Sequence, residues 1–240
     1  MITGATKNKV DDIWQRMWEG GITNPIEVIM QLTYLMFMKS LDDKELEAES
    51  MEAATGMPAK HVFPQTDEGQ SIRWSHFKDL PAEEMFDIVG QKAFPFIKTM
   101  HSDNAFAESM EDAAFGFNKP KTLEKAVSGI DDLLSNYVKD SDDLGDLYEY
   151  MLSKLNTAGA NGQFRTPQHI RNMMVALANP KPGQLICDPA CGTAGFLISA
   201  AESIRKNYGS EMDEDQWGVF YGEQFTGFDT DQTMVRISAI

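Results

Sequence analysis

The chain has 240 residues, of which 42% are hydrophobic and 24% are charged, and its formal net charge is −16 at pH 7. This composition is ordinary for a globular protein, and the length suits one or two domains. No run of about 18 apolar residues occurs, so the sequence predicts no membrane-spanning helix and no membrane partner. The acidic balance counts against a large phosphate-binding surface, because affinity for nucleic acids depends on lysine and arginine.

The charge is unevenly spread along the chain. The first 160 residues contain 28 acidic and 15 basic side chains, whereas the last 80 contain 9 acidic and 6 basic ones. If the protein acts on DNA, we expect a partner to supply most of the positive charge.

The cysteines and the N-terminus indicate a reducing compartment. Cys187 and Cys191 are the two cysteines, and no second pair of ligands accompanies them, which disfavours a zinc site or a disulfide framework. The four histidines are scattered, so we expect no metal site. The first residues contain no apolar segment of the kind that directs secretion. These features predict a cytoplasmic protein.

The first 160 residues predict a helical N-terminal domain. Apolar residues recur at helical spacing from Val10 to Trp18. Asn24 and Pro25 then combine an N-cap with a proline in the first turn, which is a typical helix start, and the apolar helix that follows is expected to run to about Glu49. Further helices are expected at about 82–100, 121–138 and 142–156, and residues 52–72, which lack periodicity, are expected to form a loop.

The pattern changes near residue 160, where we place a domain boundary between residues 1–160 and 161–240. Residues 157–163 are small and rich in glycine, and they are predicted to form a linker. Three elements follow in the order strand, helix, strand, at residues 184–188, 196–208 and 225–229. This order with short apolar strands predicts a parallel α/β sheet. Residues 207–224 are acidic and rich in glycine, and they are expected to loop out before the second strand.

A further helix is predicted just after the linker. Thr166 and Pro167 are interpreted as its N-cap and its first residue. Its apolar residues share one face and predict packing against a core: Ile170, Met173, Met174 and Leu177. Two interpretations stay open for Phe164, which contacts either a ligand or the core.

The segment from Asp188 to Gly195, with the sequence DPACGTAG, ends a strand and starts a helix. Gly192 and Gly195 let the backbone turn tightly and approach a ligand. The helix start offers free N–H groups, and the Asp188 carboxylate can pair with a cation or accept hydrogen bonds from hydroxyls. The glycine patterns that hold pyrophosphates are absent. The turn therefore favours a ligand with a positive centre and a ribose, and the alternative is an ordinary strand–helix turn that Asp188 merely caps.

DPACGTAG resembles the S-adenosylmethionine-binding motif of adenine-specific DNA methyltransferases, most closely that of the methylation (M) subunit of type I restriction–modification systems. Residues 162–167, GQFRTP, are similar to the G-x-F-x-T-P motif of that family, and the segments 120–125 and 144–150 resemble the helices that precede it. The resemblance implies an α-helical N-terminal domain followed by the start of an α/β Rossmann-like S-adenosylmethionine-dependent methyltransferase domain.

The resemblance also implies which residues bind S-adenosylmethionine. They are Gln163, Phe164, Arg165, Thr166, Pro167, Gln168, Asp188, Gly192, Thr193, Ala194, Gly195 and Asp229. In the family the G-x-F-x-T-P motif helps to hold the methionine end of the cofactor. Arg165 occupies a variable position of that motif, so we assign it no role of its own.

Asp229 closes the second predicted strand. In nucleotide-binding α/β folds a carboxylate at this place accepts hydrogen bonds from ribose hydroxyls. Its distance from Gly195 exceeds the usual spacing of about 20 residues, and residues 207–224 account for the excess. Asp231 is the alternative, and Asp229 is preferred because the family places its acid directly after Gly-x.

The catalytic motif of the family, N-P-P-F or a close relative, does not occur in this sequence. The Asn-Pro pairs at 24–25 and 179–180 continue with Ile26 and Lys181. In the family this motif holds the exocyclic amine of an adenine that is flipped out of the duplex. We therefore expect no catalytic residue here, a truncated methyltransferase sheet, and no methyl transfer by this chain alone.

The resemblance implies that the intact protein transfers a methyl group from S-adenosylmethionine to adenine N6 in DNA. It implies a specificity subunit and a restriction subunit as partners, with double-stranded DNA bound mainly through the complex. Three alternatives stay open: a methyltransferase acting on protein glutamine or RNA, a single-chain restriction–methylation enzyme, and a non-catalytic module that docks other subunits.

Overall fold

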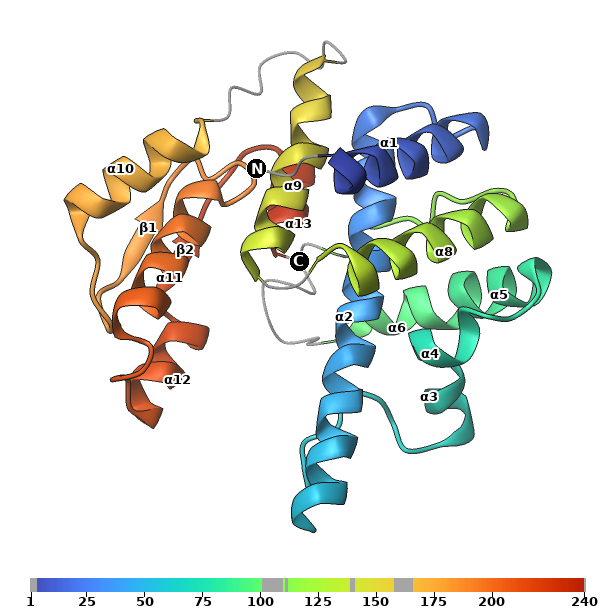
Figure 1. The fold of residues 1–240 in the computed structure, drawn as a ribbon, viewed down its shortest axis with the longest axis horizontal. Coiled ribbons are helices and arrows are strands. Elements are labelled where there is room, and N and C mark those ends of the chain that lie inside the picture. The colour runs from blue at the N-terminus through green and yellow to red at the C-terminus, as the bar shows by residue number, and fades with distance from the viewer. Residues whose placement is uncertain (1–3, 101–109, 111, 139–140, 158–165, 240) are drawn as a thin grey trace. The chain divides into compact units, whose positions relative to one another are not determined.

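The computed structural model describes residues 4–100, 110, 112–138, 141–157 and 166–239 (Figure 1). The chain divides into two compact units, Met1–Asn161 and Gly162–Ile240. In the part of the chain that the structure describes, no helix combines the length and the apolar character that crossing a membrane requires.

The first unit is built from helices, and none of its described residues is in a strand. The elements are α1 (Gly4–Glu19), α2 (Pro25–Thr55), α3 (Asp67–Ser71), α4 (Trp74–Phe77), α5 (Ala82–Ile88), the π-helical turn η1 (Val89–Ala93), α6 (Phe94–Thr99), α8 (Pro120–Asn136) and α9 (Ser141–Thr157). The predicted helical domain is thus confirmed. The predicted helix over 82–100 is present as α5, η1 and α6 in direct succession.

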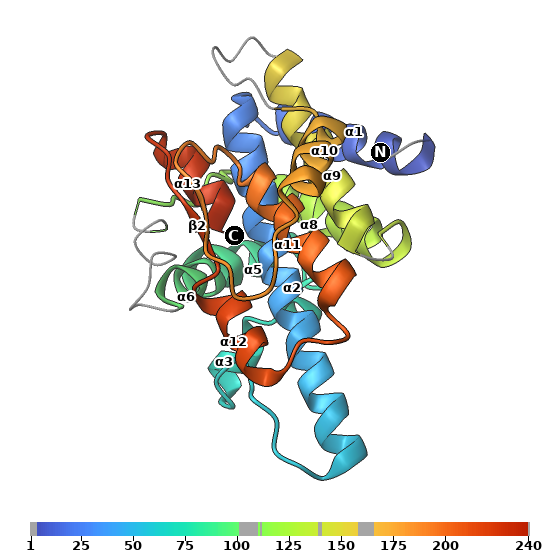
Figure 2. The ribbon, with the colours of Figure 1, turned by 90° about the vertical axis from the view of Figure 1, so that its left-hand side faces the viewer.

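Helix α2 begins where the sequence predicts. The Asn24 side chain accepts a hydrogen bond from the Ile26 N–H at 3.0 Å, and Pro25 occupies the first turn. Its first half is buried on most sides, including Val28, Ile29, Leu32, Leu35 and Met36. A helix that is apolar around most of its circumference lies inside its domain. Helix α8 packs against α1, α2 and α5, so these helices share one core (Figures 1 and 2).

The end of α2 differs from the prediction. The helix runs to Thr55 instead of ending near Glu49, and Gly56 closes it in the left-handed conformation with φ 69°. Within the predicted loop at 52–72, the residues Asp67–Ser71 form α3. The prediction was wrong because side chains from later in the sequence hold the acidic turns of α2.

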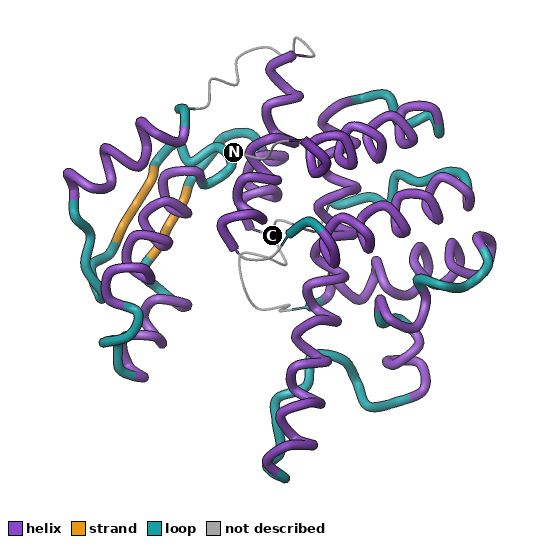
Figure 3. The backbone as a smooth tube through the Cα atoms, in the orientation of Figure 1, coloured by secondary structure: helices purple, strands orange, loops and turns teal. Residues whose placement is uncertain are grey.

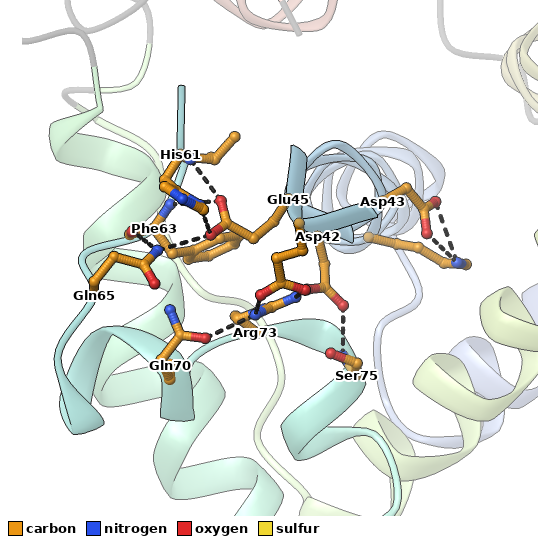
Figure 4. A network of polar contacts seen from close by, with 12 residues as sticks. Asp42, Asp43, Glu45, His61, Phe63, Gln65, Gln70, Arg73 and Ser75 are labelled. Atoms are coloured by element: carbon orange, nitrogen blue, oxygen red, sulfur yellow. Dashed lines mark hydrogen bonds and ion pairs between the residues drawn. The ribbon is translucent and has the colours of Figure 1, made fainter. Parts of the chain in front are cut away.

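The Glu45 carboxylate organises one part of these contacts (Figure 4). It has no exposed surface and accepts hydrogen bonds from the N–H groups of Val62 and Phe63 at 2.6 and 3.2 Å. Gln65 donates to it at 2.9 Å, and His61 Nδ1 lies at 2.8 Å. Burial raises the pKa of Glu45, but these hydrogen bonds outweigh burial and hold the pKa below its ordinary value. The carboxylate therefore stays charged and holds residues 61–65 against α2.

Arg73 organises the other part of the network (Figure 4). Its side chain is 3% exposed, and Nε donates to Asp42 at 2.7 Å while Nη1 donates to Glu49 at 2.5 Å. The second Asp42 oxygen accepts the Ser75 N–H at 2.7 Å. The hydrogen bond to Glu49 is the largest cause of the raised pKa of Arg73. This ion-pair network fixes the α3–α4 segment to α2.

In its described part, the second unit contains two parallel strands, as predicted, and they lie side by side (Figure 3). Its elements are α10 (Gln168–Ala178), β1 (Ile186–Asp188), α11 (Gly195–Tyr208), α12 (Glu214–Gly222), β2 (Phe225–Gly227) and α13 (Gln232–Ala239). Ile186 lies opposite Phe225 and Asp188 lies opposite Gly227. Helix α11 packs against both strands and against α10. Of the predicted linker at 157–163, only residue 157 is among the described residues.

The expected loop at 207–224 is wrong, because half of this stretch forms helix α12 and its first two residues end α11. Asp213 accepts the Gln216 N–H at 2.8 Å, and the Gln216 side chain accepts the Asp213 N–H at 3.1 Å. This reciprocal capping box is a strong helix start. Phe220 is buried with Ile204 on the inner side of the helix. Capping and burial thus outweigh the glycines that suggested a loop.

Helix α10 also differs from its prediction. Its N-cap is Pro167 and it begins at Gln168, so Thr166 lies one residue before the cap that it was expected to form. Arg171 and Val175 are its buried residues. Three of the four residues in the predicted apolar face are exposed within the described structure: Met173 by 54%, Met174 by 48% and Leu177 by 79%. The expected packing was wrong, because α11 lies against a different side of α10.

Substituting Arg73→Met should strongly destabilise the first unit. It leaves the buried Asp42 carboxylate without its cation, which typically costs about 3–5 kcal/mol of unfolding free energy. Arg16, which is exposed and pairs with Asp12 at 2.8 Å, is a matched control, and Arg16→Met should cost less than about 1 kcal/mol. Urea unfolding followed by circular dichroism measures both, and equal costs would contradict the internal role of Arg73.

His61→Asn should destabilise the protein in a pH-dependent way. The hydrogen bond to Glu45 raises the pKa of His61 above 6.5. The stabilisation that charged His61 gives the fold is therefore complete below pH 6.5 and is lost as the pH rises through the raised pKa. At acid pH the stabilisation depends on Glu45, whose pKa is lowered. The stabilisation that its charged carboxylate gives is complete above pH 4.5 and is lost as the pH falls through the lowered pKa.

The difference in unfolding free energy between unmodified protein and His61→Asn should therefore be larger near pH 6 than near pH 9. His76 is exposed on α4, and His76→Asn serves as the matched control. Urea titrations at both pH values provide the comparison. A constant difference for His61→Asn would show that the charged pair does not stabilise the fold.

Candidate functional site

The predicted site residues fall into three places in the sequence. Gln163, Phe164 and Arg165 lie outside the described residues. Thr166, Pro167 and Gln168 lead into α10. The others surround the ends of the two strands: Asp188, Gly192, Thr193, Ala194, Gly195 and Asp229.

The turn after β1 is tight and leaves the start of α11 open. Asp188 accepts the Ala190 N–H through Oδ1 at 3.1 Å, which starts the turn. Gly192 and Ala194 both have left-handed backbones, with φ of 55° and 58°. Glycine adopts this conformation freely, whereas for alanine it costs about 1 kcal/mol. Helix α11 begins at Gly195 without a side-chain N-cap, so its first N–H groups can bind a ligand.

Asp229 is held directly against this turn. Its Oδ2 accepts the Gly192 N–H at 2.9 Å, and its Oδ1 accepts the Asp231 N–H at 2.8 Å. Each carboxylate oxygen has a further lone pair, so Asp229 can still accept hydrogen bonds from a ligand. Asp229 is thus linked to the Gly-rich turn by its own side chain.

Backbone hydrogen bonds join the loops that follow the two strands. The Phe228 N–H donates to the Asp188 carbonyl at 2.9 Å, and the Cys191 N–H donates to the Phe228 carbonyl at 2.8 Å. These bonds continue the parallel pairing beyond β1 and β2. Asp188 and Asp229 therefore lie at the carboxyl edge of the sheet, where α/β folds bind ligands.

Cys191 fills space inside the turn. Its side chain is buried against Ala194 and Leu197. A Cβ atom at Gly227 would lie 2.9 Å from the sulfur, so β2 can approach the turn only with glycine there. Burial raises the pKa of the Cys191 thiol, and the charges of Asp188 and Asp229 raise it further. The thiol stays protonated, which makes it a poor nucleophile.

Two features of the site were missed from the sequence. The first is an apolar groove of about 760 Å³ whose lining includes Met174 and Val175 of α10, Asp188 of β1, and Phe196 and Leu197 of α11. Its volume is typical of small-molecule sites. The second is Arg171, which is buried between α10 and α11. Both depend on how helices pack, and no local signal in the sequence indicates either.

Comparison with protein families identifies both parts of the chain. The model of the HsdM N-terminal domain matches residues 6–130, which is more than half of the chain. The model named N-6 DNA Methylase matches residues 139–238, a stretch that includes the Gly-rich turn and Asp229.

Curated relatives agree with these families. The EcoEI methylase subunit of a type I restriction enzyme from Escherichia coli is 26% identical over 87% of this chain and 42% of its own length. The EcoKI methylase subunit from Escherichia coli K12 is 25% identical over 85% of this chain and 37% of its own length. The chain thus spans about two fifths of the length of these relatives.

Solved structures share the fold. A modification subunit of a putative type I restriction enzyme from Vibrio vulnificus YJ016 has a TM-score of 0.74 and 21% identity, covering all of this chain and 53% of that one. A chain from a study of complex assembly in a type I R-M system has a TM-score of 0.65 and 20% identity, covering 98% of this chain and 48% of that one. Together with the family matches, this confirms the resemblance found in the sequence: the chain belongs to the family of type I restriction enzyme methylase subunits.

Proposed function

We propose that this chain is the part of a type I methylation subunit that binds S-adenosylmethionine, and that the intact protein methylates adenine N6 in DNA. The observation that carries the proposal is the hydrogen bond between Gly192 and Asp229, which joins the Gly-rich turn to the second strand at the carboxyl edge of a parallel sheet. The match of residues 139–238 to N-6 DNA methylases supports the reaction.

The groups at the turn fit this cofactor. When bound, S-adenosylmethionine supplies a methyl group on a positively charged sulfonium. Asp188 and Asp229 offer carboxylate oxygens for ribose hydroxyls and favour a positive centre nearby. The uncapped start of α11 offers N–H groups to an anionic group such as the carboxylate of the methionine moiety.

The other predicted cofactor residues stay part of this proposal. Thr166, Pro167 and Gln168 would contact the methionine end, together with Gln163, Phe164 and Arg165. Thr193 is buried in the turn, and Ala194 precedes the helix, so their backbone groups would line the site. In contrast, we assign no residue of this chain to hold the target adenine, because its sequence contains no N-P-P-F motif.

We further propose that the protein works in a complex with a specificity subunit and a restriction subunit, and that DNA is bound mainly through that complex. The net charge of −16 supports this division, because an acidic protein gains little from phosphate contacts of its own. The match of residues 6–130 to the HsdM N-terminal domain favours this proposal over methyltransferases that act on protein glutamine or RNA.

Asp229→Asn should weaken binding of S-adenosylmethionine by roughly tenfold, because a charged acceptor for ribose hydroxyls is lost. Asp188→Asn should have a similar effect. Isothermal titration calorimetry on the full-length protein measures both, with thermal unfolding as a check on folding.

Two matched variants make this prediction specific. Asp215 is exposed in the first turn of α12, and Asp215→Asn should leave affinity unchanged. Asp231→Asn tests the alternative ribose acceptor and should also bind normally. Loss of affinity in Asp231→Asn with normal binding in Asp229→Asn would transfer the role to Asp231.

This chain alone is not expected to methylate DNA. Aligning the methyl donor with the target nitrogen contributes about 7 kcal/mol to catalysis. We assign no residue of this chain to hold the target nitrogen. The chain is incubated with labelled S-adenosylmethionine, DNA and a specificity subunit, and an intact methylase subunit is the positive control. Label in the DNA above background would contradict the prediction.

A further inference from the structure

Arg171 lies between α10 and the first turns of α11. It is 5% exposed, although arginine is rarely buried to this extent. A Cβ atom at Gly195 would lie 3.2 Å from its Nε atom and 3.3 Å from Cδ and Cζ. The guanidinium therefore packs directly against the backbone where the Gly-rich turn becomes a helix, and glycine at position 195 provides the room.

The same guanidinium reaches back to the residue before α10. Its Nη1 donates to the Thr166 carbonyl at 2.7 Å, and its Nε donates to the buried Ser199 hydroxyl of α11 at 3.4 Å. The first carbonyl that α10 itself uses is that of Pro167, which accepts the N–H groups of Ile170 and Arg171. The Thr166 carbonyl thus lies outside the hydrogen bonds of the helix and takes its donor from Arg171.

We propose that Arg171 is a positioning residue that fixes Thr166 relative to the first turn of α11. The inference rests on the proposed function, in which Thr166 and Gly195 belong to two segments that bind one cofactor. An arginine suits this role, because its planar group has five donors in a fixed arrangement and can contact two segments at once. Lysine has the charge but not this geometry.

The expected consequence is a selective loss of affinity. Thr166 belongs to the segment assigned to the methionine end of the cofactor, whereas Asp229 is assigned to the ribose. A displaced Thr166 should therefore weaken binding of S-adenosylmethionine more than binding of 5′-methylthioadenosine, which has the ribose and adenine but no amino-acid group. A general loss of structure would weaken both ligands alike.

The test uses Arg171→Lys and Arg171→Met in the full-length protein, with calorimetry for both ligands. Each variant should bind S-adenosylmethionine about tenfold more weakly and 5′-methylthioadenosine less than about twofold more weakly. Arg205, exposed near the end of α11, provides the matched controls Arg205→Lys and Arg205→Met, which should bind both ligands normally. Ser199→Ala, which removes the acceptor of Nε, should show the same selectivity with a loss of about threefold.

Three results would overturn the inference. Equal losses for the two ligands would make Arg171 a general structural residue. Normal binding by Arg171→Lys would show that charge without the planar geometry is enough. If either Arg171 variant fails to fold, Ser199→Ala decides, and equal or absent losses there count against the inference. Failure of the unmodified protein to bind S-adenosylmethionine would overturn the proposed function itself, which separates the two failures.

Discussion

The Gly192 N–H donates to the carboxylate of Asp229, a residue 37 positions later, and the candidate site depends on this bond. It closes the turn after β1 against the loop after β2, so the two strand ends form one surface. Together with the backbone bonds between Phe228 and the turn, it holds the left-handed backbones of Gly192 and Ala194 in place. Because strain of this kind persists only where surrounding contacts determine the conformation, the bond explains how an alanine is tolerated in the turn.

The sequence was informative where a few adjacent residues determine a local structure. Asn24 with Pro25 predicted the start of α2, and the segment from Asp188 to Gly195 predicted the order of strand, turn and helix. Asp229 was assigned to the site because it ends the second predicted strand, where nucleotide-binding α/β folds have a ribose acceptor, and because the family places its acid directly after Gly-x. Its hydrogen bond to Gly192 could not be predicted, because the spacing between them includes α12, which was taken for a loop.

The other errors have a common physical cause, which is that packing between distant segments overrides local patterns. The end of α2 is held by Arg73 and by residues 61–65, and nothing within α2 itself indicates these contacts. In α10 the apolar face at Met173 and Leu177 suggested burial, yet α11 lies against the side with Arg171 and Val175. A charged residue was thus buried where an apolar one was expected, which is why Arg171 escaped attention.

Burial of basic side chains bears on the proposal that DNA is bound mainly through a complex. Of the 21 lysines and arginines, Arg73 and Arg171 are 3% and 5% exposed, and Lys39 is also buried. Further lysines are paired with carboxylates, as Lys78 is with Asp131 at 2.9 Å. Cations committed to internal contacts release no counterions from DNA, so fewer charges serve phosphate binding than the composition suggests. The charges of the described residues therefore support the proposal that a partner supplies most of the positive charge for DNA.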